Sequence, residues 1–250
     1  MKAFICGVVA IVCLEGLASA DEAGEPTTAV STSVRDVLGA NYSNALHRPL
    51  TGGRATLLMS GGWDTSLDRP RAEINGWLHL YGPLSFSLGA AHGASGAWRP
   101  SAGMAVALWR PVRNGPEGHL LVQYKAEGFS EPEGEIELTA RGGYRWDSAS
   151  IFAESSYGQD GEGRERDAEL AADVVTTSGA FSLGLGARGR KAFGEKKEAI
   201  RSDLVVAPHA GLIVTEGHFV CVTAGASVVS TEGATRTGVI GLASYAVAIP

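Results

Sequence analysis

The segment that most constrains the fold is residues 71–93, in which apolar and polar side chains alternate. From Ala72 to Leu80 every second residue is small or apolar, and the residues between them include Glu73 and His79. After a Gly-Pro step at 82–83 the alternation resumes from residue 84. Alternation with a period of two is typical of a β-strand with one apolar face, so this segment predicts a hairpin of two strands.

The N-terminus has the pattern of a secretory signal peptide. Lys2 precedes an apolar run at residues 3–14. Residues 17–20 (LASA) end in the Ala-x-Ala pattern of a signal-peptide cleavage site. We expect residues 1–20 to be a signal peptide cleaved before Asp21. The alternative, a retained anchor, is disfavoured because the apolar run is shorter than the roughly 20 residues of a spanning helix.

Residues 21–50 differ in composition from the rest of the chain. They are polar and rich in Thr and Ser, which predicts a linker, with one short helix allowed by the capping-box spacing of Ser33 and Asp36. The chain carries a net charge of −6 at pH 7 and has no basic cluster, so no nucleic-acid partner is expected. Cys221 is the only cysteine after residue 20, so the exported domain has no internal disulfide.

From residue 51 to residue 250 the strand pattern repeats. The predicted strands cover residues 54–61, 71–81, 84–91, 101–110, 119–129, 135–146, 150–158, 167–176, 181–188, 203–214, 218–229 and 237–248. The connections after the second, sixth, eighth and tenth strands are short, and those after the first, third, seventh and ninth are longer and polar. This alternation, with an even strand count, is typical of an antiparallel up-and-down barrel with both termini in the periplasm.

The chain resembles the broad class of Gram-negative outer-membrane β-barrels, most clearly at residues 84–90 (LSFSLGA) and 181–187 (FSLGLGA). The resemblance implies an all-β, antiparallel, up-and-down transmembrane barrel of about 10–12 strands over residues 51–250. It also implies the bacterial outer membrane as the location, with outer-membrane lipid and the barrel-assembly machinery as partners. One departure is the C-terminus, because Pro250 stands where such barrels usually end in an aromatic residue.

Two further features favour a membrane barrel. Most predicted strands have the roughly 9–11 residues that a spanning strand needs. Aromatic residues also lie near predicted strand ends, as an interfacial belt requires; they are Trp63, Tyr81, Trp98, Trp109, Phe129, Tyr144, Trp146 and Tyr157. The alternative from the same pattern is a soluble periplasmic β-barrel or sandwich that binds a ligand.

The polar faces of the predicted strands carry many charges. The candidates for charged lumen residues are Glu73, Lys125, Glu127, Arg141, Arg145, Glu154, Glu169, Asp173 and Arg188, with Glu135, Glu137, Arg190 and Asp203 in the same phases. A charge facing lipid costs about 2–4 kcal/mol near the midplane, so these side chains are expected to point inward. They would line a narrow pore or site for small solutes, with a mild cation preference, or neutralise one another in a closed lumen.

No catalytic, metal or cofactor site is predicted. The G-x-G-x-x-G match at residues 184–189 continues a strand and opens no helix, and the six histidines lack metal-ligand spacing. A membrane-embedded lipid hydrolase is a further alternative, for which His79 and His209 are the histidines in polar phases. Cys221 lies between two nearly apolar faces, so the sequence leaves its direction open.

Overall fold

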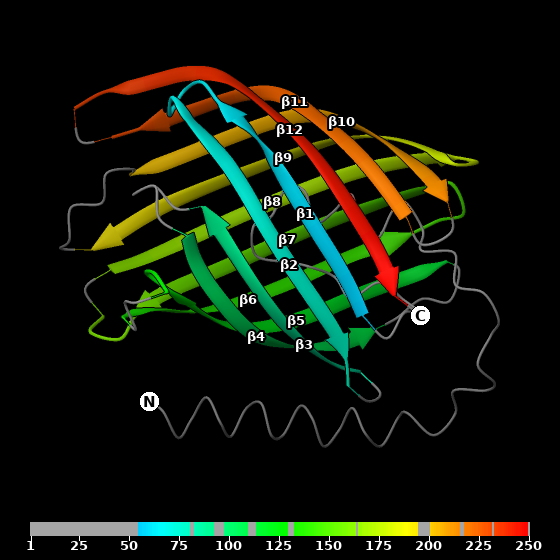
Figure 1. The fold of residues 1–250 in the computed structure, drawn as a ribbon, viewed down its shortest axis with the longest axis horizontal. Helices are drawn as coiled ribbons and strands as arrows, with labels where there is room; N and C mark the ends of the chain where they lie inside the picture. The colour runs from blue at the N-terminus through cyan, green and yellow to red at the C-terminus, as the bar shows by residue number, and fades with distance from the viewer. Residues whose placement is uncertain are drawn as a thin grey trace.

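The computed structural model describes residues 55–80, 83–92, 98–109, 114–129, 133–163, 165–194, 201–215, 218–231 and 233–249. These residues form twelve strands and one closed barrel (Figure 1). The predicted signal peptide, the linker at 21–50, Gly82 of the predicted turn and Pro250 lie outside the described residues. No helix among the described residues is long and apolar enough to cross a membrane.

The strands follow one another around the barrel in chain order. They are β1 (Ala55–Asp64), β2 (Arg69–His79), β3 (Leu84–His92), β4 (Trp98–Trp109), β5 (Gly115–Ala126), β6 (Gly134–Arg145), β7 (Ala149–Asp160), β8 (Glu165–Ser178), β9 (Phe181–Gly194), β10 (Ser202–Thr215), β11 (His218–Ser230) and β12 (Thr235–Ile249). Each strand pairs antiparallel with the next, and β1 pairs with β12 from Ala55 and Ile249 to Asp64 and Ile240. This closing pair leaves no sheet edge. The predicted antiparallel up-and-down barrel is confirmed.

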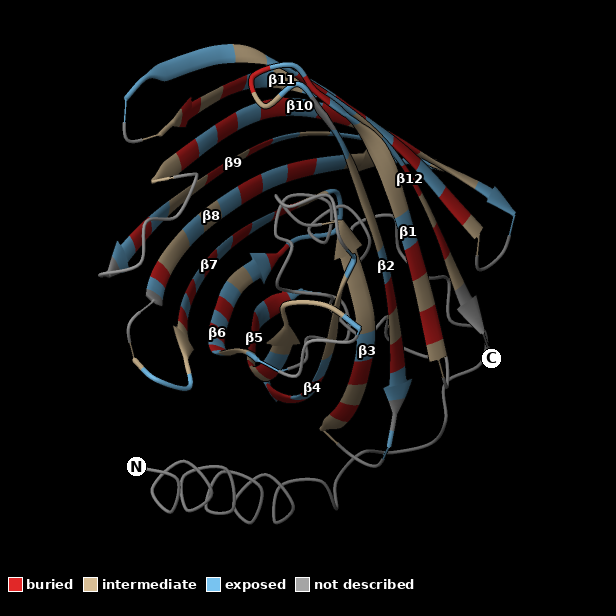
Figure 2. Cartoon of the chain, turned by 60° about the vertical axis from the view of Figure 1, so that its left-hand side comes forward, coloured by how far each residue is buried: buried red, intermediate tan, exposed pale blue. Residues whose placement is uncertain are grey.

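The barrel has an apolar outside and a polar inside. Buried and exposed residues alternate along most strands (Figure 2). The exposed positions include Leu170, Phe181 and Leu183, whose exposed fractions are 64–68%. The buried positions on the opposite phase include Glu137 and Arg141, which are 4–5% exposed. The distribution is therefore inverted relative to a protein folded around an apolar core in water.

Several strands extend into segments that the sequence indicated were loops. Residues 62–70 were expected to connect the first two strands, but Trp63 pairs with Pro70 and the connection covers only residues 65–68. The charged segments expected as loops at 159–166 and 190–201 likewise lose residues to β7, β8 and β9. These three connections are shorter than expected because charged side chains near the strand ends face the lumen, where charge is compatible with a strand.

The predicted aromatic positions lie on the exposed surface wherever they are described. Their exposed fractions run from 37% for Trp98 to 79% for Phe129, and Tyr81 lies outside the described residues. The direction of Cys221, which the sequence left open, is inward. Its side chain is 2% exposed and packs with Leu58 and Phe219.

Close packing between neighbouring strands makes Gly225 intolerant of a side chain. A Cβ atom at this position would lie 2.2 Å from Cβ of Ala207 and 2.3 Å from the carbonyl oxygen of Val206. We expect Gly225→Ala to lower the free energy of unfolding by about 1–3 kcal/mol, the usual cost of overpacking. Urea titration followed by tryptophan fluorescence measures this change.

The matched control is Gly241→Ala, because a Cβ atom at Gly241 meets nothing within 4 Å. Equal effects of the two substitutions would contradict the packing of β11 against β10.

Candidate functional site in the barrel lumen

The lumen divides into two halves of different chemistry. We call the end that holds the start of β1 and the end of β12 the terminal rim, and the opposite end the far rim (Figure 1). A cavity of about 210 Å³ lies in the half near the far rim. Its charged lining residues are Arg71, Glu73, Arg99, Lys125, Glu135, Glu137, Asp167, Glu169, Arg188, Arg190 and Asp203.

Ion pairs between neighbouring strands organise the cavity wall. The Lys125 ammonium lies 2.5 Å from the Glu137 carboxylate, which links β5 to β6. The Arg190 guanidinium donates a hydrogen bond of 2.6 Å to the Asp167 carboxylate, which links β9 to β8. The strand register brings these side chains together, since Lys125 is paired with Glu135 and Arg190 with Glu169, one inward position away.

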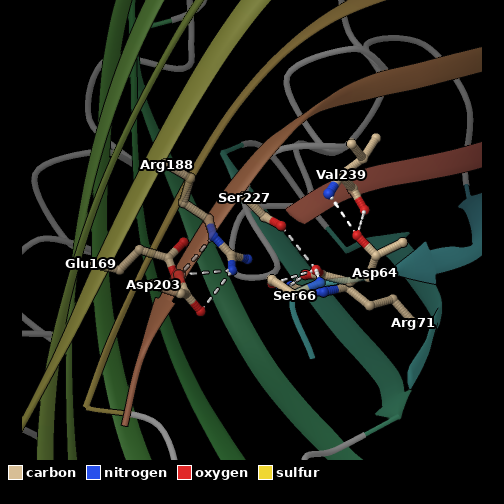
Figure 3. A network of polar contacts seen from close by, with 9 residues as sticks. Asp64, Ser66, Arg71, Glu169, Arg188, Asp203, Ser227 and Val239 are labelled. Carbon is tan, nitrogen blue, oxygen red and sulfur yellow. Dashed lines mark hydrogen bonds and ion pairs between the residues drawn. The ribbon is translucent and has the colours of Figure 1, made fainter. Parts of the chain in front are cut away.

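Arg188 joins three strands. It lies 3.3 Å from the Asp203 carboxylate of β10 and 3.9 Å from the Glu169 carboxylate of β8 (Figure 3). Its side chain is only 5% exposed, so the charge is held in a site of low dielectric. Such a charge is tolerable only when it is paired, and the two flanking acids provide that pairing.

Asp64 fastens the turn between β1 and β2 to the barrel wall. Its buried carboxylate accepts hydrogen bonds from Arg71 at 2.8 Å and from the hydroxyls of Ser66 and Ser227 at 2.6 and 2.9 Å (Figure 3). The next residue, Thr65, accepts a 2.7 Å hydrogen bond from the amide of Val239 on β12. The turn is thus bound to β11 and β12, next to the pair that closes the barrel.

The described side chains in the half of the lumen near the terminal rim are largely buried. Charged groups there are paired or stacked: Glu117 with Arg145 at 2.8 Å, Asp173 with His209 at 3.0 Å, and Arg141 over the ring of Phe152 at 4.3 Å. Two apolar clusters complete this half. One consists of Leu58, Val175, Phe219, Cys221 and Ala246, and the other of Trp77, Ala105 and Leu121.

The nine candidate lumen residues fall into three groups. Glu73, Lys125, Glu169 and Arg188 line the cavity. Arg141, Arg145, Glu154 and Asp173 are buried in the lumen but do not line the cavity. Glu127 lies after the last residue of β5 and is half-buried near the far rim, with its amide bonded to the carbonyl of Glu133.

Sequence reasoning missed several charged residues of the lumen. Asp64 and Arg71 hold the β1–β2 turn, Glu117 pairs with Arg145, Asp167 pairs with Arg190, and Arg99 lines the cavity. Asp64 and Glu117 lay in segments expected to be connections. Each lies an even number of positions from an inward residue of the same strand, as Glu117 does from His119. Residues with this spacing point to the same face of a strand, and this signal could have identified them.

The ion pair of Glu117 with Arg145 offers a test of the packed half. Glu117→Leu leaves Arg145 buried without this carboxylate, so we expect a loss of about 3–5 kcal/mol in the free energy of unfolding. The double variant Glu117→Leu/Arg145→Met removes both charges and should recover most of this loss. Urea titration of both variants measures the difference, and additive losses would contradict the pairing.

Comparison with known proteins identifies the fold. No family model matches the sequence, and no curated protein matches it. Among solved structures, the NanC porin is similar with a TM-score of 0.55 at 9% identity, over 78% of this chain and 99% of the porin. The KdgM porin is similar with a TM-score of 0.54 at 7% identity, over the same shares. At such low identity the likeness shows the fold alone: the chain folds as a porin-type β-barrel.

Proposed function

We propose that this protein is a bacterial outer-membrane barrel that acts as a narrow pore for small polar solutes. The observation that carries the proposal is the inversion of the barrel: apolar side chains cover the outside, and charged side chains line the inside. A soluble β-barrel would place its apolar face inside, because burying apolar surface is what stabilises a fold in water. The soluble alternative is therefore disfavoured.

The dimensions of the barrel support membrane residence. Its strands run from 9 residues in β3 to 15 in β12, which meets the roughly 9–11 residues needed to span. Closure by the β1–β12 pair satisfies the backbone groups that lipid cannot solvate. In this proposal residues 1–20 direct export, the assembly machinery inserts the barrel, and both rims with their aromatic residues lie at the lipid interfaces.

The membrane-embedded hydrolase is not favoured by the structure. The His209 side chain is 0% exposed and contacts Asp173 inside the lumen, so it does not face lipid. The side chain of His79, the other histidine considered, lies outside the described residues.

Localisation is tested by cell fractionation. We expect the protein in the outer-membrane fraction, with different mobility on SDS gels before and after boiling, because a closed barrel resists detergent until heated. Recovery as a soluble periplasmic protein would overturn the proposal.

Burial depth in the membrane gives a second test. Leu185 lies near the middle of β9 and is 55% exposed, whereas Phe193 lies near its end and is 45% exposed. We expect Leu185→Arg to lower the free energy of unfolding in lipid by about 2–4 kcal/mol, and Phe193→Arg by about 0–1 kcal/mol. Urea titration in vesicles measures both values, and equal costs would contradict a spanning orientation.

Ion selectivity tests the charged cavity. Six acidic and five basic residues line it, which favours cations slightly. The double variant Glu73→Gln/Glu135→Gln leaves four acids against five bases, so we expect the preference to reverse to anions. The reversal potential in a planar bilayer under a salt gradient measures this change. Glu133→Gln, on the exposed surface before β6, is the control and should preserve the cation preference.

A further inference from the structure

We propose that Trp77 and Phe219 form an aromatic constriction below the cavity and set the size limit of the solutes that cross the lumen. This inference rests on the proposed pore function, because it concerns the same path. It names residues that the charge pattern of the sequence did not single out. The argument follows from where the cavity ends, what fills the lumen beneath it, and which of those side chains carry no charge.

Along β2 and β11, toward the terminal rim, the aromatic residue is the first or second inward-facing residue after the last one that lines the cavity. Asn75 lines the cavity on β2, and the next inward residue toward the terminal rim is Trp77. Thr223 lines it on β11, and the next inward residues are Cys221 and Phe219. Neither aromatic residue lines the cavity.

The strand register relates the positions of the two aromatic residues. Phe219 is paired with Ala246, Ala246 with Leu58, and Leu58 with Asn75, which immediately precedes Trp77 among the inward residues of β2. Trp77 is 3% exposed and Phe219 is 1% exposed. Solvent therefore reaches neither ring from the cavity or from the terminal rim.

Each ring lies over small residues of nearby strands. A Cβ atom at Gly211 of β10 would lie 2.3 Å from the tip of the Phe219 ring, so this ring covers the glycine. Phe219 belongs to the apolar cluster that includes Val175 of β8. Trp77 packs with Ala105 of β4 and Leu121 of β5, which places it across the short side chains of β3.

The aromatic layer differs from the charged layers on either side in how it could open. Moving Arg145 or Asp173 would separate a buried ion pair, whereas the Trp77 and Phe219 rings carry no charge and pack in apolar clusters. The cavity above offers space into which a ring can turn. Narrow apolar constrictions gate passage in channels, so the rings restrict the size of the solutes that cross.

Solute flux tests the constriction directly. Vesicles containing the protein are exposed to neutral sugars of graded size, and their swelling rates are compared for wild type, Phe219→Ala and Trp77→Ala. We expect both variants to admit larger sugars and to raise single-channel conductance by at least twofold. The control is Phe181→Ala, an aromatic residue on the outer face that is 64% exposed, which should leave the size limit unchanged.

Cys221 gives a readout that does not depend on flux. It lies two residues from Phe219 on the same face and is 2% exposed. We expect a small, charged, water-soluble thiol reagent to label Cys221 at least tenfold faster in Phe219→Ala than in wild type. A Cys221→Ser variant subtracts labelling at any other cysteine.

The outcomes separate this inference from the proposed function. Unchanged size limit and unchanged labelling in variants that keep their heat-modified mobility would overturn the constriction, even if wild type conducts. Faster labelling in Phe219→Ala with no flux through wild type would support the constriction and count against a conducting pore. If Phe219→Ala fails to fold, Phe219→Leu replaces it, with the same expected direction and a smaller effect.

Discussion

The pairing of β1 with β12 is the constraint on which the rest of the structure depends. It closes the sheet, so that the backbone groups of the first and last strands find partners in each other. Closure fixes an inside and an outside, and the pleat then sends successive side chains to opposite environments. The Asp64 and Thr65 contacts to β11 and β12 strengthen this seam at the far rim.

Ion pairs between neighbouring strands neutralise several charges of the lumen. Lys125, Arg188 and Arg190 each lie beside a carboxylate on a neighbouring strand, so a narrow lumen can hold many charges in a low dielectric. The sequence left two readings open, a charged pore and a lumen filled by neutralised charge. The structure shows a charged cavity near the far rim and buried, packed side chains near the terminal rim.

The strands were predictable because period-two alternation depends only on local sequence. The ends of the strands were less predictable. A charged residue such as Asp64 or Glu117 is typical of a loop, and it is compatible with a strand only when its side chain points into the lumen. We assigned the nine candidate charged residues to the lumen because a charge facing lipid is costly. Of these nine, only Glu127 lies outside a strand. Which acid pairs with which base required the register between strands, which no single strand encodes.

The sequence by itself determined the fold class, the approximate strand count and the face that most strands turn inward, because these follow from alternation and from the cost of a charge in lipid. Only the tertiary structure decided that Cys221 points inward and that Trp77 and Phe219 lie where the cavity ends. Both faces of β11 near Cys221 are apolar, so its direction depends on the register with β10 and β12. Contacts across the lumen join residues far apart in the chain, and barrel closure alone brings them together.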